Sequence, residues 1–276
     1  MAPSCKKNGS SPPPSTIALP ATIKHRNSAS DSPSSRPLIL KKQPSLPIKE
    51  PRNSTRTTKI KTMNPQEYID TLNWRYACKK FNPQAHIDAP TWDALEESLH
   101  LSPSSIGLQL WHFIVVDTPA LRAQLREVSW GQAQVTDADR YVILCTRRDA
   151  TTTDVDALLN LINEKRHPSP EKMKGTENFM KGYINGFDGN DDKKQTWLES
   201  QVHIALGFLV SAAANLKVDS CVIGGMDRDA CDNILGLTNT PYRSLVGVAL
   251  GYRSQEDEYA QQIKVRFPKN SVIEHR

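Results

Sequence analysis

Residues 193–216 read KKQTWLESQVHIALGFLVSAAANL. The stretch contains no proline and a single glycine, and its apolar side chains recur around much of a helical circumference rather than along one stripe. A helix that is apolar on most sides has to be covered by other elements. We therefore predict a long, central, buried helix. Its apolar positions are Trp197, Val202, Ala205, Leu206, Phe208, Leu209, Ala212, Ala213 and Leu216.

Four shorter apolar segments flank this helix in the sequence, and each is short enough to be a β-strand. They are residues 111–117, 141–147, 218–226 and 244–252. Strands and helical patterns alternate irregularly and no repeat is present, which favours a layered mixed α/β domain over a regular βαβ array. The last apolar stretch, SVIEH (271–275), is predicted to add a short strand to another sheet edge.

The remaining helices are indicated by their capping residues. Asn64, Asp88 and Asp227 each precede a helical pattern, as N-caps do. Residues 152–190 are helical in pattern but polar, and HPSP at 167–170 breaks them into two parts.

Charge is distributed unevenly over the 276 residues, whose net value is +5. Residues 1–62 carry twelve Lys and Arg against two acids, together with ten prolines and eleven serines. This composition predicts disorder. Three interpretations remain open: an organelle transit peptide, an extension upstream of a start at Met63, or a basic tail for an acidic surface. The basic character thus belongs to the tail and does not indicate a nucleic-acid partner for residues 63–276.

Cysteine usage and hydropathy exclude several classes of protein. The five cysteines are scattered without a CxxC pair or a Cys/His cluster, which argues against a zinc site and a disulfide framework. No apolar run approaches the roughly 18–20 residues that span a bilayer. We expect neither a metal nor a membrane partner, and a cytoplasmic location unless residues 1–62 direct the chain to an organelle.

Two basic clusters are candidate anion sites. RYACKKFNP (75–83) holds Arg75, Lys79 and Lys80 within six positions and lacks a carboxylate. Like charges this close repel each other unless an anion lies opposite, and Arg and Lys both suit phosphate. In KVRFP (264–268), Lys264 and Arg266 are two apart, so they share one side of an extended segment. A solvated basic helix end is the competing interpretation of the first cluster.

Three loops are candidate ligand contacts, although each alone is typical of an ordinary loop. They are PSSIG (103–107), WGQAQ (130–134) and VIGGMD (222–227). Glycines at a strand end permit close backbone approach to a planar ligand. The sequence has no GxSxG elbow, Walker loop or dinucleotide GxGxxG. His112 and His203 are expected to be structural.

The order and spacing of these motifs over residues 67–275 resemble the FMN-dependent nitroreductase family, in particular oxygen-insensitive NAD(P)H nitroreductases. The resemblance implies an FMN-binding domain at 63–276 with an α+β, three-layer α/β/α fold and a mixed, largely antiparallel sheet. It also implies an intertwined homodimer with FMN in its interface.

The resemblance assigns most FMN contacts residue by residue. Basic residues of the first and last motifs hold the phosphate and the flavin edge, the 103–105 loop reaches the FMN of the other subunit, and the glutamines and glycines surround the isoalloxazine ring. The implied cofactor-binding residues are Arg75, Tyr76, Ala77, Lys79, Pro103, Ser104, Ser105, Gly107, Gln134, Gln201, Val222, Ile223, Gly224, Gly225, Lys264 and Arg266.

The sequence departs from the family pattern at several of these positions. Ala77 replaces a frequent serine, Gly107 a frequent asparagine and Leu110 a usual proline. Residues 222–225 replace a frequent Pro-x-Glu-Gly. In the family the glutamate of that motif acts on flavin N5 largely through its backbone amide, and the resemblance implies that Gly224 keeps this donor. The departures leave substrate preference open more than flavin binding.

The implied activity is transfer of two electrons from NAD(P)H through FMN to nitroaromatics, quinones or similar acceptors by a ping-pong mechanism. The cofactor carries the chemistry, so no catalytic side chain is assigned, while Lys264 and the Gly224 backbone tune the flavin. The competing functions are those of a flavin reductase, enone reductase or dehalogenase of the same family, or of a non-catalytic flavin-binding redox protein.

Overall fold

The computed structural model describes residues 64–276. The interpretations of residues 1–62 as disordered, targeting or regulatory therefore lie outside the described residues. Among the helices that are described, none combines the length and the apolar character that crossing a bilayer requires.

The centre of the domain is a four-stranded antiparallel sheet with the order β1-β2-β4-β3. Its strands are β1 (Trp111–Val115), β2 (Arg140–Arg147), β3 (Asp219–Ile223) and β4 (Tyr242–Gly251). These are the four strands that the sequence predicts. The six inner residues of β2 are all buried because layers of helices cover both faces of the sheet.

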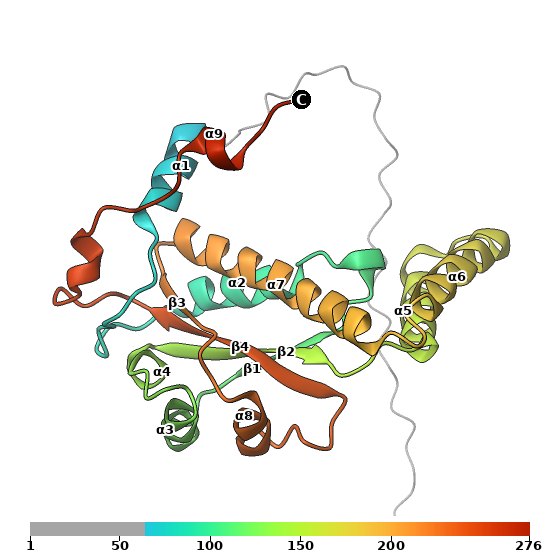
Figure 1. The fold of residues 1–276 in the computed structure, drawn as a ribbon, viewed down its shortest axis with the longest axis horizontal. Helices are drawn as coiled ribbons and strands as arrows, with labels where there is room; N and C mark the ends of the chain where they lie inside the picture. The colour runs from blue at the N-terminus through green and yellow to red at the C-terminus, as the bar shows by residue number, and fades with distance from the viewer. Residues whose placement is uncertain (1–63) are drawn as a thin grey trace, which may run out of the picture. The chain divides into compact units, whose positions relative to one another are not determined.

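Successive residues of β2 point to opposite faces and so belong to different hydrophobic clusters. Val142 and Leu144 pack with α2 (Ala89–His100) and α7 (Asp191–Asn215). Tyr141 and Ile143 pack on the other side, where the helices are α3 (Pro119–Glu127), α4 (Gln134–Asp137) and α8 (Arg228–Ile234). Figure 1 shows the two helical layers on either side of the sheet. The predicted three-layer α+β arrangement is confirmed.

The long helix α7 differs from its prediction in one respect. Its inward face, including Val202, Ala205 and Leu209, is fully buried against the sheet. On its other side Ile204 and Phe208 remain 40 % and 45 % exposed. The helix is therefore central but covered on one side only within this chain, because the described residues provide no second layer above it.

The polar stretch after β2 forms a helical hairpin, as its pattern predicts. α5 (Thr152–Arg166) and α6 (Pro170–Asn185) are separated at the predicted break, where His167 ends α5 with a left-handed backbone (φ 46°). They pack together with the start of α7 through a separate cluster that contains Leu159, Met180 and Leu198.

The remaining elements are short, apart from α1 (Pro65–Trp74) at the start of the described chain. They are η1 (Ser105–Gly107), η2 (Glu258–Gln261) and α9 (Lys269–Val272). The predicted strand at 271–275 is wrong for this chain: α9 follows Pro268, and residues 273–276 pair with no strand edge among the described residues.

One close approach inside the sheet restricts the sequence. The phenol ring of Tyr141 is fully buried and lies against Gly247 of β4, where an added Cβ would be 2.7 Å from the ring carbon Cζ. If residue 247 had a Cβ, either the Tyr141 ring or the backbone of β4 would have to move.

We therefore expect Gly247→Ala to lower the free energy of unfolding by about 1–3 kcal/mol through overpacking. Gly175→Ala is the matched control, since Gly175 is exposed inside α6 with no atom near its Cβ position. It should raise stability by about 0.5–1 kcal/mol. Urea unfolding measures both changes, and equal stability of the two variants would contradict the close approach.

Candidate functional site

The two basic clusters from opposite ends of the domain line one cavity of about 360 Å³. Arg75 and Lys79 come from the segment after α1, and Lys264 and Arg266 from the segment after η2. The described residues that line the cavity include no Asp or Glu. The third cation of the first cluster, Lys80, lies outside and forms an exposed ion pair with Glu256 at 3.5 Å.

The cations in this cavity face one another at a cost in free energy. The Lys264 ammonium donates a hydrogen bond to the backbone carbonyl of Arg75. Burial, and then repulsion from Arg75 and Arg266, lowers the pKa of Lys264 below its ordinary value. A bound anion would relieve this repulsion. Arg75 follows the last residue of α1 and lines the cavity with Lys264 and Arg266, whereas Lys79 and Lys80 are exposed, as the competing interpretation of a solvated helix end predicts.

An arginine that the sequence reasoning missed fastens this region to the sheet. The Arg253 guanidinium forms a double hydrogen bond with the buried carboxylate of Asp219, with contacts of 2.5 and 2.9 Å to Oδ1. It also lies 4.3 Å from the ring centroid of Trp74 and 4.6 Å from that of Tyr76. The end of α1, the start of β3 and the segment after β4 therefore meet at one side chain.

A second missed residue, Asp257, holds the first basic motif directly. Its carboxylate, in a residue that is only 3 % exposed, accepts hydrogen bonds from the Tyr76 hydroxyl and the backbone amides of Lys79 and Lys80. Ala77 in turn forms a parallel bridge with Ser220 of β3. The only sign of Asp257 in the sequence is the acidic run SQEDE (254–258), and such a run is typical of an exposed surface.

The glycine turn after β3 lies against the WGQAQ loop. A Cβ at Gly225 would be 2.5 Å from Cε3 of the exposed Trp130 indole, so a larger residue there would require that ring to move. Gln132 donates a hydrogen bond to the Gly225 carbonyl at 3.2 Å. Gln134, the residue selected from the sequence, is buried at the start of α4. Gln132 is thus the glutamine of this loop that reaches the turn, while Val222 and Gly224 are exposed beside it.

The PSSIG loop is joined to α7 instead. The Ser105 amide donates a hydrogen bond to Oε1 of Gln201 at 2.7 Å. Gln201 lies 14 residues before the end of α7 at Asn215, a distance of about 21 Å along the helix axis. Lys217, just past that end, donates a hydrogen bond to Thr71 of α1, next to the cation cavity. Within one chain, Ser105 and Gln201 are therefore remote from the cavity.

The described histidines and cysteines named in the sequence form no nucleophilic or metal site. His112 is exposed and stacks on Tyr242 at 5.0 Å, and the His203 ring forms a hydrogen bond with the Glu199 carbonyl of its own helix at 2.9 Å. Burial raises the pKa of the Cys145 thiol to about 12 and that of Cys231 to about 11. Within residues 64–276, no group of His, Cys, Asp and Glu could hold a metal ion.

Comparison with known families identifies the family of this domain. The model of the "Nitroreductase family" matches residues 72–252, which include the whole sheet and the first basic motif. The chain belongs to the nitroreductase family. The match ends before residues 253–276, so Lys264 and Arg266 of the cavity lie beyond it.

Relatives of this nitroreductase-family chain span nearly all of the described residues. A Staphylococcus saprophyticus protein named "Putative NAD(P)H nitroreductase" is 31 % identical over 220 residues, covering 77 % of this chain and 98 % of its own. The structure of the Bacillus subtilis "putative nitroreductase ydfN" superposes with a TM-score of 0.69 at 15 % identity, over 77 % of this chain and 100 % of that one. A "putative nitroreductase in complex with FMN" from Exiguobacterium sibiricum has a TM-score of 0.62 at 18 % identity, covering 78 % and 100 %.

We expect the cation cavity to bind a phosphate monoester. A charge-assisted hydrogen bond contributes about 1.5–3 kcal/mol, so Arg75→Ala should weaken binding of FMN about ten- to a hundredfold. Lys80→Ala is the matched control: the same charge is removed five positions away, outside the cavity, and affinity should change less than about twofold, because exposed pairs contribute little. Fluorescence titration measures both, and wild-type affinity in Arg75→Ala would contradict the assignment.

Proposed function

We propose that the protein is an NAD(P)H:FMN oxidoreductase that reduces nitroaromatic, quinone or similar acceptors by a ping-pong mechanism. The observation that carries the proposal is the carboxylate-free cavity formed by Arg75, Lys79, Lys264 and Arg266. Four cations gathered from two ends of a nitroreductase-family domain, one of them with a depressed pKa, fit a doubly charged phosphate.

The residues present fit FMN at the phosphate end and along the strand edge. Arg75, Lys79 and Arg266 would neutralise the phosphate, and Lys264 would lie between them and the flavin. The backbone of residues 76–77, held beside β3, and the exposed Gly224 would contact the rest of the cofactor. FMN, when bound, supplies the hydride and electron-transfer chemistry, which leaves positioning and charge to the protein.

Steady-state kinetics test the activity. Full-length protein should carry the absorption spectrum of a flavin and oxidise NADPH or NADH in the presence of menadione or a nitrofuran. Because one site would serve donor and acceptor in turn, double-reciprocal plots at several acceptor concentrations should be parallel. Intersecting lines would contradict the ping-pong mechanism. Tight FMN binding without turnover on any acceptor would favour the non-catalytic flavoprotein. Turnover limited to free flavins, enones or halogenated compounds would favour a flavin reductase, an enone reductase or a dehalogenase, respectively.

We further propose that the working unit is a homodimer that pairs through α7. Ile204 and Phe208 lie one turn apart on the uncovered side of this helix, and fully burying one such side chain gains about 1.5–3 kcal/mol. A dimer also accounts for the separation within one chain: the loop held by Gln201 would serve the cation cavity of the partner subunit rather than its own.

Phe208→Asp should therefore shift the protein to a monomer and weaken FMN binding at least tenfold, because it places a charge in the apolar interface. Ala123→Asp adds the same charge at an exposed position of α3, in the opposite helical layer, and should leave the dimer intact. Light scattering after size exclusion gives the mass. A wild-type monomer that binds one FMN tightly would contradict the dimer.

A further inference from the structure

The buried carboxylate of Asp257 accepts three hydrogen bonds from the first basic motif. It follows β4 and caps η2, where its Oδ1 accepts a hydrogen bond from the Tyr259 amide at 3.1 Å. Its Oδ2 accepts the Tyr76 hydroxyl at 2.8 Å and the backbone amides of Lys79 and Lys80 at 2.7 and 3.1 Å. Both oxygens of one buried carboxylate are thus committed, one to each of two segments about 180 residues apart.

The surroundings of Asp257 and Tyr76 determine which of the two carries the proton. Burial alone raises the pKa of Asp257, but hydrogen bonds from the Lys80 and Lys79 amides and the Tyr76 hydroxyl outweigh it, and the pKa lies below its ordinary value. Burial, and then the hydrogen bond to Asp257, raises the pKa of Tyr76 far above its ordinary value. Across the neutral range the carboxylate therefore accepts and the phenol donates.

These contacts join the two halves of the cation cavity. One half is carried by residues 75–79, whose backbone Asp257 holds through Oδ2. The other half is carried by residues 259–266, which follow the turn that Asp257 caps through Oδ1. Asp257 itself does not line the cavity. A ligand in the cavity would therefore make no contact with Asp257, which would act on it through the spacing of the cations and through its own negative charge.

We propose that Asp257 is the positioning residue of the phosphate end of this site: it sets the spacing between the Arg75–Lys79 and Lys264–Arg266 pairs and so gives the protein its preference for a phosphorylated flavin over an unphosphorylated one. The proposal rests on the proposed function, because it concerns the same cavity. Asp257 would thus determine the selectivity for the phosphate without contacting the phosphate itself.

Comparing FMN with riboflavin tests this role, since the two differ only by the phosphate. In Asp257→Asn one acceptor oxygen is replaced by an amide donor, so either the motif or the turn loses its acceptor. We expect FMN affinity of the flavin-stripped, full-length protein to fall at least tenfold and riboflavin affinity to fall less than threefold. Tyr76→Phe removes one of the contacts to Oδ2 and keeps the carboxylate, and should reduce the FMN-to-riboflavin preference to an intermediate value.

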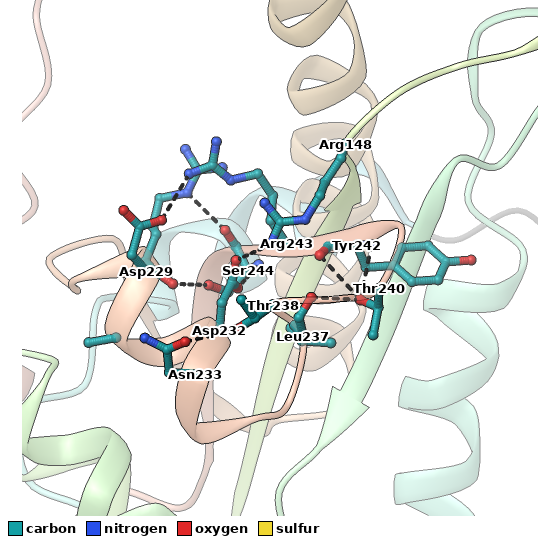
Figure 2. Close-up of polar contacts among 12 residues, drawn as sticks. Arg148, Asp229, Asp232, Asn233, Leu237, Thr238, Thr240, Tyr242, Arg243 and Ser244 are labelled. Carbon is teal, nitrogen blue, oxygen red and sulfur yellow. Dashed lines mark hydrogen bonds and ion pairs between the residues drawn. The ribbon is translucent and has the colours of Figure 1, made fainter. Parts of the chain in front are cut away.

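Asp232 is the matched control for loss of a buried aspartate. It is also 3 % exposed, and it accepts hydrogen bonds from the Ser244 amide at 2.6 Å and from Arg148 at 2.7 Å. Figure 2 shows this cluster around Ser244, near the start of β4, whereas Asp257 follows the other end of that strand. Asp232→Asn should lower the melting temperature but leave the FMN-to-riboflavin ratio unchanged.

Glu256→Gln is the control for charge alone. Glu256 is adjacent to Asp257 and exposed, so the substitution removes one negative charge near the cavity without releasing the motif. Its flavin preference should match the wild type. If Glu256→Gln changed the ratio as much as Asp257→Asn, overall charge rather than positioning would explain the effect.

The outcomes separate this inference from the proposed function. Wild-type protein that binds neither flavin would overturn both. Wild-type preference for FMN, together with an equal fractional loss of FMN and riboflavin in Asp257→Asn, would overturn only the positioning role and make Asp257 a general stabilising residue. If Asp257→Asn does not fold, Tyr76→Phe decides: an FMN-to-riboflavin ratio equal to that of the wild type would overturn the role, and a reduced one would support it.

Discussion

The contact between Arg253 and Asp219 is the constraint on which the candidate site depends. Asp219 begins β3 and is almost fully buried, so its charge requires a partner, and the bidentate guanidinium supplies it. The same guanidinium lies against the rings of Trp74 and Tyr76, which places the start of the first basic motif beside the sheet. Removing one partner of such a pair typically costs about 3–5 kcal/mol. Asp257 then extends the attachment along residues 76–80.

These contacts hold the backbone of the site in place, but the positive charges that it brings together repel one another. The cavity gathers cations that repel one another, and two of the candidate ligand loops contain residues in left-handed backbone, Ile106 at φ 48° and Trp130 at φ 57°. Such conformations cost about 1–3 kcal/mol each and persist where the surrounding structure enforces them. In this domain the cost falls on the loops and the cavity, while β2 and β4 are packed on both faces. The close packing is therefore in the sheet, and the strained backbone is in the loops outside it.

The proposed homodimer would account for two features at once, the uncovered side of α7 and the division of the candidate FMN residues. A helix whose inner face fills the core needs apolar residues on that face only, yet α7 continues them on the outer face at Ile204 and Phe208. The loop that Gln201 holds lies far from the cation cavity of the same chain. A second copy of the chain would cover the first feature and complete the second.

The sequence by itself determined the type and order of the main elements, since apolar periodicity and capping residues act over a few neighbouring positions. The four strands, the long helix and the break at 167–170 were all predictable, and the order of the motifs indicated the family. Only the tertiary structure decided which contacts form across long separations. It placed Lys264 against Arg75, brought Gln132 to the glycine turn, left one side of α7 uncovered, and made Asp257 a buried acceptor. The physical reason is distance along the chain. The burial of Asp257 and the hydrogen bonds that it accepts depend on backbone from about 180 residues away. A local sequence pattern does not specify which distant backbone will approach.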